Sequence, residues 1–495
     1  MRAPRVWWFV AVMTTGAITL AACTGDAEGK SGAEPAATTV VLANSGNDLD
    51  LLPGVQFFVD HLRGLSKGRM TVRVASRWGA EEDEVDVLKG VAEGKADLGV
   101  SGTRALDQVG VRGLTPLNAP FLVDSYAAQN AVLADPAITQ QLEGLRAAGL
   151  VGLALLADNL RMPVARAKPM VSVEDYSGAV IRVPKSDAQV NGLRALGARP
   201  ATTSYNETMD GSEVSWDNYV GDTSGAHLAR FVTVNTALWP RSLVIFANPE
   251  ALEGLTDQER DWVEAAASDA ARWSMDHSRD EETDQIAEAC SKGVKVATAD
   301  ARQIASLNEA AQPFYQSLRD DPETATVMRV VERLTSELSP DNPPEIPAGC
   351  RFRPGDEALA AMPLEPLTAP GESGALPEGV YRYELTEADL SAAGLPENDV
   401  YENAGVFTWM IESGRWSFLQ LPANTDVPNT RCEGYYDVAG SRVAMSVSTV
   451  TKVGDCAPLL WTATWSSTSD SLVWSDVSVD DFARVWAAKP WQKIG

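Results

Sequence analysis

The sequence is poor in the residues on which most enzyme and metal sites depend. It holds three histidines and five cysteines in 495 residues. His61, His227 and His277 lack the spacing of a zinc-protease motif or of a nucleophile–base pair, and Ser101 in "GVSGT" is not a Gly-x-Ser-x-Gly elbow. No Cys-x-x-Cys pair is present either. We therefore expect no catalytic site, no metal and no cofactor.

Basic residues are also in deficit, with 41 Lys and Arg against 68 Asp and Glu and a formal net charge of −27. Because a phosphate backbone is bound by a basic face, no nucleic-acid partner is expected. Long apolar runs are scarce, and the N-terminal run "VWWFVAVMTTGAITL" is too short for a comfortable membrane span. The length predicts two to four domains, and the 45% of hydrophobic residues suffices for sizeable cores.

The N-terminus reads as an export signal. Arg2 and Arg5 precede the apolar run, and "LAAC", ending at Cys23, follows it. This order is that of a secretory signal, and a cysteine directly after Leu-Ala-Ala resembles the bacterial lipobox, whose cysteine is lipidated. We expect residues 1–23 to be a lipoprotein signal peptide, with lipidated Cys23 holding the mature chain on the extracytoplasmic face of the cell membrane. A normally cleaved signal with a chance cysteine is the alternative.

The remaining four cysteines are even in number, as expected for disulfide bonds in an exported protein. Three pairings are possible. Proximity along the chain favours Cys290–Cys350 and Cys432–Cys456. A zinc site is the competing interpretation, but no Cys-x-x-Cys motif or histidine pair supports it.

Composition divides the chain beyond the signal into four segments. Residues 24–39 are small and polar, which indicates a flexible tether. Across residues 40–337, short apolar strands alternate with helical patterns, which predicts an α/β domain with largely parallel sheets. Residues 338–375 are rich in Pro and Gly and read as a linker. In residues 376–495, short strands with Gly-bearing turns predict an antiparallel barrel or sandwich, similar to lipocalin-like barrels.

Two further patterns predict local structure. Thr256 and Glu259 form a capping box ahead of a helical pattern from Asp257 to Lys292, which Gly293 ends. We expect one unusually long helix lying across two lobes. The C-terminal segment contains seven of the fourteen tryptophans, which we expect in its core; stacking on a carbohydrate is the alternative.

A charged residue ends one of the predicted strands. In "YSGAVIRVPKS", from Tyr176 to Ser186, an apolar run carries Arg182 shortly before Pro184. In open α/β sheets, ligands bind beyond the carboxyl ends of the strands. A guanidinium offers two parallel N–H donors to a carboxylate and keeps its charge. We therefore expect Arg182 to hold the carboxylate of a small ligand; an ordinary surface arginine on an edge strand is the alternative.

Four segments occur in the order and spacing found in a known family. They are "FFVDHLRGLSKGRMTVRVASRWGAEEDEVDVLKGVAEGKADLGV", "LTPLNAPFLVDS", "VEDYSGAVIRVPKSDAQVNGLRALGARP" and "MDGSEVSWDNYV". Together they resemble the substrate-binding proteins of TRAP (tripartite ATP-independent periplasmic) transporters over residues 40–335. The last segment departs from the family pattern, because Ser215 and Trp216 replace an Asp-Gly pair before Asn218.

The resemblance implies a two-lobed fold like that of type II periplasmic binding proteins, which closes on a small organic acid. It implies that Arg182 clamps the ligand carboxylate and that Arg161, in "DNLRMPVA", is a second arginine of the site. Asn218 and Trp216 would line the wall near the hinge. Polar residues at strand ends of the first lobe complete the expected site: Ser45, Asn47 and Ser101.

We therefore expect an extracytoplasmic solute-binding lipoprotein that delivers a small carboxylate to TRAP-type permease subunits, without covalent chemistry. The alternative is a lipid-anchored sensor or scaffold of the same fold, whose β domain binds a partner protein. An exported hydrolase built on the C-terminal barrel is a third possibility, which lacks a candidate nucleophile–base pair.

Overall fold

The computed structural model describes the greater part of the chain after the predicted tether. The described residues are 37–46, 49, 52–79, 83–203, 208–220, 229–291, 293–338, 344–357, 367–371, 374–425, 427–448, 460–478 and 485–495. Cys23, Asn47 and Cys456 lie outside them, so the lipid anchor, one site residue and the Cys432–Cys456 pair stay predictions. Within the described ranges, no helix combines the length and the apolar character needed to cross a bilayer.

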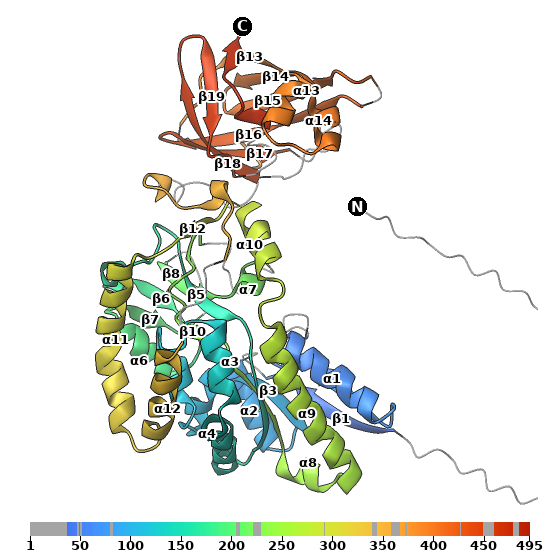
Figure 1. Cartoon of the computed structure of the whole chain (residues 1–495), viewed down its shortest axis with the longest axis vertical. Helices are drawn as coiled ribbons and strands as arrows, with labels where there is room; N and C mark the ends of the chain where they lie inside the picture. Colours follow the sequence, from blue (N-terminus) through green and yellow to red (C-terminus); the bar gives the residue numbers. More distant parts are fainter. Residues whose placement is uncertain are drawn as a thin grey trace, which may run out of the picture. The chain divides into compact units, whose positions relative to one another are not determined.

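The first lobe is built on a mixed sheet with the strand order β2-β1-β3-β11-β4. Its strands are β1 (Thr38–Ala43), β2 (Met70–Ala75), β3 (Leu98–Gly102), β4 (Val151–Leu156) and β11 (Leu243–Ala247). Strand β1 is parallel to β2 and β3, whereas β11 is antiparallel to β3 and β4. Helices α1 (Pro53–Leu65) and α9 (Asp257–His277) lie side by side (Figure 1). Helix α9 also packs against β4.

The second lobe has its own mixed sheet, in the order β12-β9-β5-β8-β6-β7, with β10 paired to β5. The strands are β5 (Leu160–Ala165), β6 (Val180–Arg182), β7 (Arg199–Ala201), β8 (Gly211–Val214), β9 (Phe231–Thr233), β10 (Trp239–Pro240) and β12 (Lys295–Ala297). The prediction of largely parallel sheets is wrong for the strands that join the lobes. The chain passes directly from β4 to β5 and from β10 to β11, and both β5 and β11 pair antiparallel with their neighbours.

The remaining helices of the two lobes are short, apart from α11 and α12. They are α2 (Glu84–Ala92), α3 (Tyr126–Ala134), α4 (Pro136–Thr139), α5 (Val173–Tyr176), α6 (Asp187–Ala195), α7 (Trp216–Val220), α8 (Pro249–Glu253), α10 (Glu282–Ser291), α11 (Ala301–Asp320) and α12 (Ala325–Ser336). Turns of 3₁₀ helix are η1 (Thr103–Val109), η2 (Thr115–Asn118), η3 (Gln140–Ala148) and η5 (Ala348–Cys350).

The expected single long helix is two helices. The capping box of Thr256 and Glu259 begins α9 as predicted, but α9 ends at His277 and α10 starts at Glu282. From residue 276 to residue 285 the sequence has no apolar side chain. Since a surface helix is held mainly by an apolar stripe, nothing anchors a continuous helix through this stretch.

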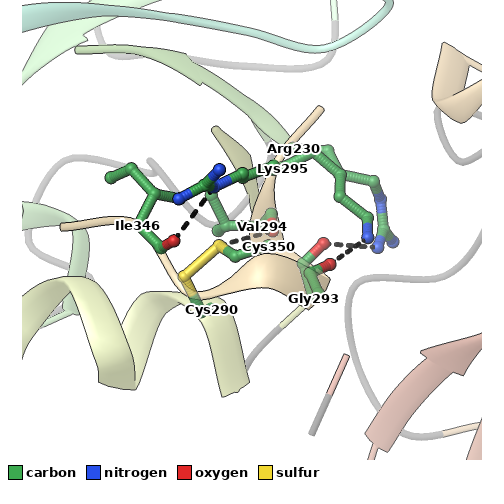
Figure 2. The surroundings of a disulfide bond; sticks show 9 residues. Arg230, Cys290, Gly293, Val294, Lys295, Ile346 and Cys350 are labelled. Atoms are coloured by element: carbon green, nitrogen blue, oxygen red, sulfur yellow. Dashed lines mark hydrogen bonds between the residues drawn. A yellow bond between two sulfur atoms is a disulfide. The ribbon is translucent and has the colours of Figure 1, made fainter. Parts of the chain in front are cut away.

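The predicted Cys290–Cys350 disulfide is confirmed. It joins the end of α10 to the segment after the second lobe, where Arg351 forms a parallel bridge with Val296 of β12. Figure 2 shows the disulfide with Lys295 beside it. Lys295 Nζ donates a hydrogen bond of 2.6 Å to the carbonyl oxygen of Gly349. Part of the predicted linker is therefore packed on the edge of the second-lobe sheet.

The C-terminal region forms a closed antiparallel barrel of strands β13 to β20, as expected. The strands are β13 (Gly379–Leu385), β14 (Gly405–Glu412), β15 (Arg415–Pro422), β16 (Thr430–Ala439), β17 (Arg442–Val447), β18 (Leu460–Ser467), β19 (Ser471–Ser475) and β20 (Trp491–Lys493), with helices α13 (Glu387–Ala392) and α14 (Glu397–Asn403). The ring of Trp409 packs against those of Trp461, Trp474 and Trp491, and all four side chains are fully buried. These tryptophans are core residues, as predicted.

Candidate functional site

Three neighbouring strands of the second-lobe sheet carry the charged residues of the site. Arg161 lies on β5, Glu213 on β8 and Arg182 at the end of β6, and the strands are adjacent in the order β5-β8-β6. Strand β6 ends just before Pro184, which has no N–H to continue the ladder. The register places Glu213 opposite Pro163 and Arg182 opposite Ser212.

Glu213 is fully buried and receives the arginine side chains. Arg161 donates to its carboxylate from Nε at 2.5 Å and from Nη2 at 3.3 Å. Nη1 of Arg182 lies 3.7 Å from Glu213 Oε1. Burial acts to raise the pKa of Glu213, but the guanidinium groups of Arg161, Arg104 and Arg182 outweigh it and lower the pKa. Glu213 is therefore a buried anion that holds cations together.

The first lobe contributes a third arginine. Arg104, in η1 directly after β3, places Nη1 3.8 Å from Glu213 Oε1. The same side chain donates to Glu84 at the start of α2, from Nε at 2.8 Å and Nη2 at 3.2 Å. Despite burial, Arg104 lowers the pKa of Glu84 to about 2. Three guanidinium groups thus face two carboxylates, which leaves one positive charge uncompensated within the cluster.

Arg182 differs from the other two arginines in its partners. Its side chain is 24% exposed, yet its Nε is buried and has no hydrogen-bond partner in the part of the chain that the structure describes. Burial lowers the pKa of Arg182; Glu213 opposes this, and repulsion from Arg104 and Arg161 adds to it. Such a guanidinium has donors available to an anion from outside the protein.

The structure brings Asn218 into the same network. Arg161 Nη1 donates to Asn218 Oδ1 at 2.6 Å and to Ser215 Oγ at 2.8 Å, so three side chains fix this guanidinium. Trp216 lies between these two partners in sequence, but its indole is buried in the apolar core of the second lobe beside Tyr219. Its role in ligand binding stays a prediction.

The two described first-lobe residues lie near the carboxyl ends of the neighbouring strands β1 and β3. Ser101, on β3, is buried, and its Oγ donates to the backbone oxygen of Glu84 at 3.4 Å, next to the Glu84–Arg104 pair. Ser45 is half-buried and follows β1, the parallel neighbour of β3. Asn47 lies outside the described residues.

Sequence reasoning missed Glu84, Arg104 and Glu213. The sequence offered one signal for them: Glu213 is the charged residue of "GSEV", within the quoted segment "MDGSEVSWDNYV". In the structure "GSEV" is the strand β8, and all four residues are buried. Among the described residues, no three His, Cys, Asp or Glu side chains converge as metal ligands would.

Comparisons with known proteins agree with this arrangement. The family described as bacterial extracellular solute-binding protein, family 7 (DctP), matches residues 51–321. A sugar acid binding protein from Advenella mimigardefordensis, solved with galactonate, is 19% identical with a TM-score of 0.55, over 60% of this chain and 99% of its own.

Two TRAP periplasmic solute-binding proteins are similar to the chain in the same way. One, from Bradyrhizobium sp. BTAi1 with α/β-D-galacturonate, is 25% identical with a TM-score of 0.53, over 60% of this chain and 99% of its own. The other, from Polaromonas sp. JS666 with D-erythronate, is 18% identical with a TM-score of 0.54, over 60% and 98% respectively. The family match ends before the barrel begins.

Proposed function

The chain belongs to family 7 of the bacterial extracellular solute-binding proteins, and from this premise we propose that it captures a small sugar acid outside the cell and delivers it to a TRAP-type permease. The ligand class is a hydroxylated compound with one carboxylate. The protein carries out no covalent chemistry. It binds by closing two lobes around the ligand, as two-lobed binding proteins do.

The observation that carries this proposal is the Nε of Arg182, which is buried and has no hydrogen-bond partner among the described residues. Arg182 belongs to a cluster with one uncompensated positive charge. A single carboxylate supplies the missing charge and accepts two parallel N–H bonds from the guanidinium. Galactonate, galacturonate and erythronate, found in the similar structures, each carry one carboxylate and several hydroxyl groups. The ligand chemistry and the charge of the cluster therefore agree.

Each arginine has a distinct part in this mechanism. Arg182 takes the carboxylate, while Arg161, already held by Glu213, Ser215 and Asn218, keeps Glu213 and the neighbouring wall in place. Arg104 links the first lobe to Glu213, so it contributes to the closed state. The remaining predicted residues contact the hydroxylated end of the ligand or support the wall: Ser45, Asn47, Ser101, Trp216 and Asn218.

The N-terminal sequence adds a location to this function. Residues 1–23 act as a lipoprotein signal peptide, and Cys23 anchors the protein to the extracytoplasmic face of the membrane, where the permease lies. Residues 24–39 tether a binding domain of residues 40–337, and a linker of residues 338–375 joins it to a β domain of residues 376–495. Mass spectrometry of the membrane fraction checks the anchor: a diacylated Cys23 supports it, and an unmodified, released chain contradicts it.

Calorimetry tests the ligand class. The purified protein is titrated with D-galacturonate, D-galactonate and D-erythronate, and in parallel with the uncharged compounds D-galactose, galactitol and erythritol. We expect saturable binding of at least one acid and none of its uncharged counterpart. Equal binding of an acid and its counterpart, or no binding of any acid, contradicts the proposal.

A further inference from the structure

A cavity lies where the two lobes join, and the residues of the arginine cluster do not line it. Its volume is about 450 Å³. The first lobe lines it with the N-terminal turn of α1 and the end of α9, and the second lobe with α7 and α10. The connection from β4 to β5 passes through the lining as well, at Asp158. Arg104, Arg161, Arg182 and Glu213 do not line it.

The lining of this hinge cavity is strongly acidic. Six carboxylates line it, and among the described residues no lysine or arginine does. Two of them lie beside an arginine outside the lining: Asp158 is 3.2 Å from Arg241, and Glu282 accepts from Arg279 at 2.8 Å. The described residues of the lining itself therefore supply negative charge and no positive charge.

The carboxylate of Asp217 indicates which kind of group the cavity can bind. The residue is 7% exposed, and its Oδ2 accepts a hydrogen bond of 3.1 Å from Asn218 Nδ2. Its Oδ1 is buried and has no hydrogen-bond partner in the described ranges, although Asp217 lines the cavity. A buried carboxylate oxygen without a donor is costly, so the site is built for a donor that enters from the cavity.

The size and walls of the cavity restrict what that donor can be. In the described part of the chain no three acidic or histidine side chains converge as a metal ion requires, and the volume is in the range that holds an organic molecule. Leu52, Leu243 and Trp273 supply apolar wall. The ring of Trp273 already stacks on those of Phe57 and His277, and the charged groups of the lining that could meet a cation are carboxylates.

We propose that the hinge cavity is a second ligand site, which takes a small organic molecule bearing a primary ammonium group. An ammonium carries three N–H donors and no acceptor, which matches a buried carboxylate oxygen that lacks a donor. Asp217 Oδ1 is the primary acceptor, and Asp158 adds a second buried carboxylate. This site does not depend on the sugar acid proposed above, because the two ligands carry opposite charges and meet different residues.

Calorimetry of the whole protein with 1,4-diaminobutane tests the site, with 1,4-butanediol as the uncharged probe of similar shape. We expect saturable binding of the diamine to the wild-type protein and none of the diol, a comparison that needs no variant. Asp217→Asn weakens diamine binding at least ten-fold. Asp284→Asn, the same change at an exposed position of α10 outside the lining, leaves it unchanged.

Three results overturn the proposal. They are no saturable binding of the diamine, equal binding of the diol, and equal diamine affinity in the wild type and Asp217→Asn. Competition with D-galacturonate separates this site from the arginine cluster: the diamine stays bound when the sugar acid is added, and its displacement places it in the arginine cluster and refutes a second site.

Discussion

Glu213 holds three guanidinium groups from both lobes at one buried carboxylate. Glu213→Gln keeps the shape of the side chain but leaves the three cations without their shared anion. We expect the free energy of unfolding to fall by roughly 3–5 kcal/mol, as when one partner of a buried ion pair is removed. Urea denaturation followed by circular dichroism measures it.

The matched control for this prediction is Glu384→Gln, on the exposed side of β13. An exposed substitution of this kind changes stability by about 0.5 kcal/mol or less. If Glu213→Gln is as stable as Glu384→Gln, the cluster does not depend on Glu213.

The lowered pKa of Lys295 leads to a prediction of how the free energy of unfolding changes with pH. Burial, with repulsion from Arg442, Arg353 and Arg230, lowers its pKa from 10.5 to about 7 in the folded protein. Between these two values the unfolded chain binds the proton more strongly, so this lysine makes stability rise with pH from about 7 to 10. Below pH 7 the lysine is protonated in both the folded and the unfolded state, so its destabilising effect no longer changes with pH. The slope is at most about 1.4 kcal/mol per pH unit.

Lys295→Met removes this titration. We expect the wild-type protein to gain stability relative to Lys295→Met as the pH rises from 7 to 9.5, measured by urea denaturation at each pH. Lys89→Met, exposed on α2, serves as the control. Parallel curves for the wild type and Lys295→Met would show that the buried lysine does not titrate in this range.

The site residues differ in how far the sequence could reveal them. Arg182, Arg161 and Asn218 stand beside recognisable strand patterns, and the structure brings all three to the Glu213 network. Glu213 itself could not be placed, because β8 lies between β5 and β6 although it follows both along the chain. Strand neighbours of this kind depend on tertiary pairing, which a single sequence does not show.

At the scale of elements, the Cys290–Cys350 disulfide closes a loop of 60 residues between α10 and the packed part of the linker. The Cys290→Ala/Cys350→Ala protein lacks this cross-link in its unfolded state. The loop-entropy relation gives a loss of roughly 4 kcal/mol. Thermal unfolding without reductant measures it.

The same double variant should release the linker segment from the sheet edge. Hydrogen exchange should increase at Phe352, whose amide donates to Val296 of β12 at 2.8 Å. Hydrogen exchange in α1, which is distant in sequence from both cysteines, is the internal control. Unchanged melting and exchange would show that the disulfide adds nothing to this contact.

Elements were predictable where local patterns decide them. The capping box at Thr256 begins a helix as expected, because it depends only on residues three positions apart. The break between α9 and α10 was missed because the capping and stop signals marked only the two ends of the pattern. The antiparallel strands β5 and β11 were missed because their direction follows from the crossing between lobes.

At the scale of the whole molecule, side-chain contacts as well as the linker join the barrel to the second lobe. Phe231 of β9 packs with Ala444 and Leu460 of the barrel. Arg442, on β17, pairs with Asp356 of the linker, and both side chains are buried. A buried pair of this kind fixes the geometry of a contact more than it adds stability. The alternation of the C-terminal strands predicted the barrel, whereas this contact with the lobe could not be read from the sequence.

The central claim is that the Arg182 guanidinium binds the carboxylate of a sugar acid between the lobes, and titration calorimetry of Arg182→Ala tests it most directly. The titrant is the acid that binds the wild type most tightly among D-galacturonate, D-galactonate and D-erythronate. We predict a loss of about 1.5–3 kcal/mol, a 10- to 100-fold weaker affinity, with Arg194→Ala, exposed on α6, unchanged. An Arg182→Ala protein that binds the acid as tightly as the wild type would contradict the account.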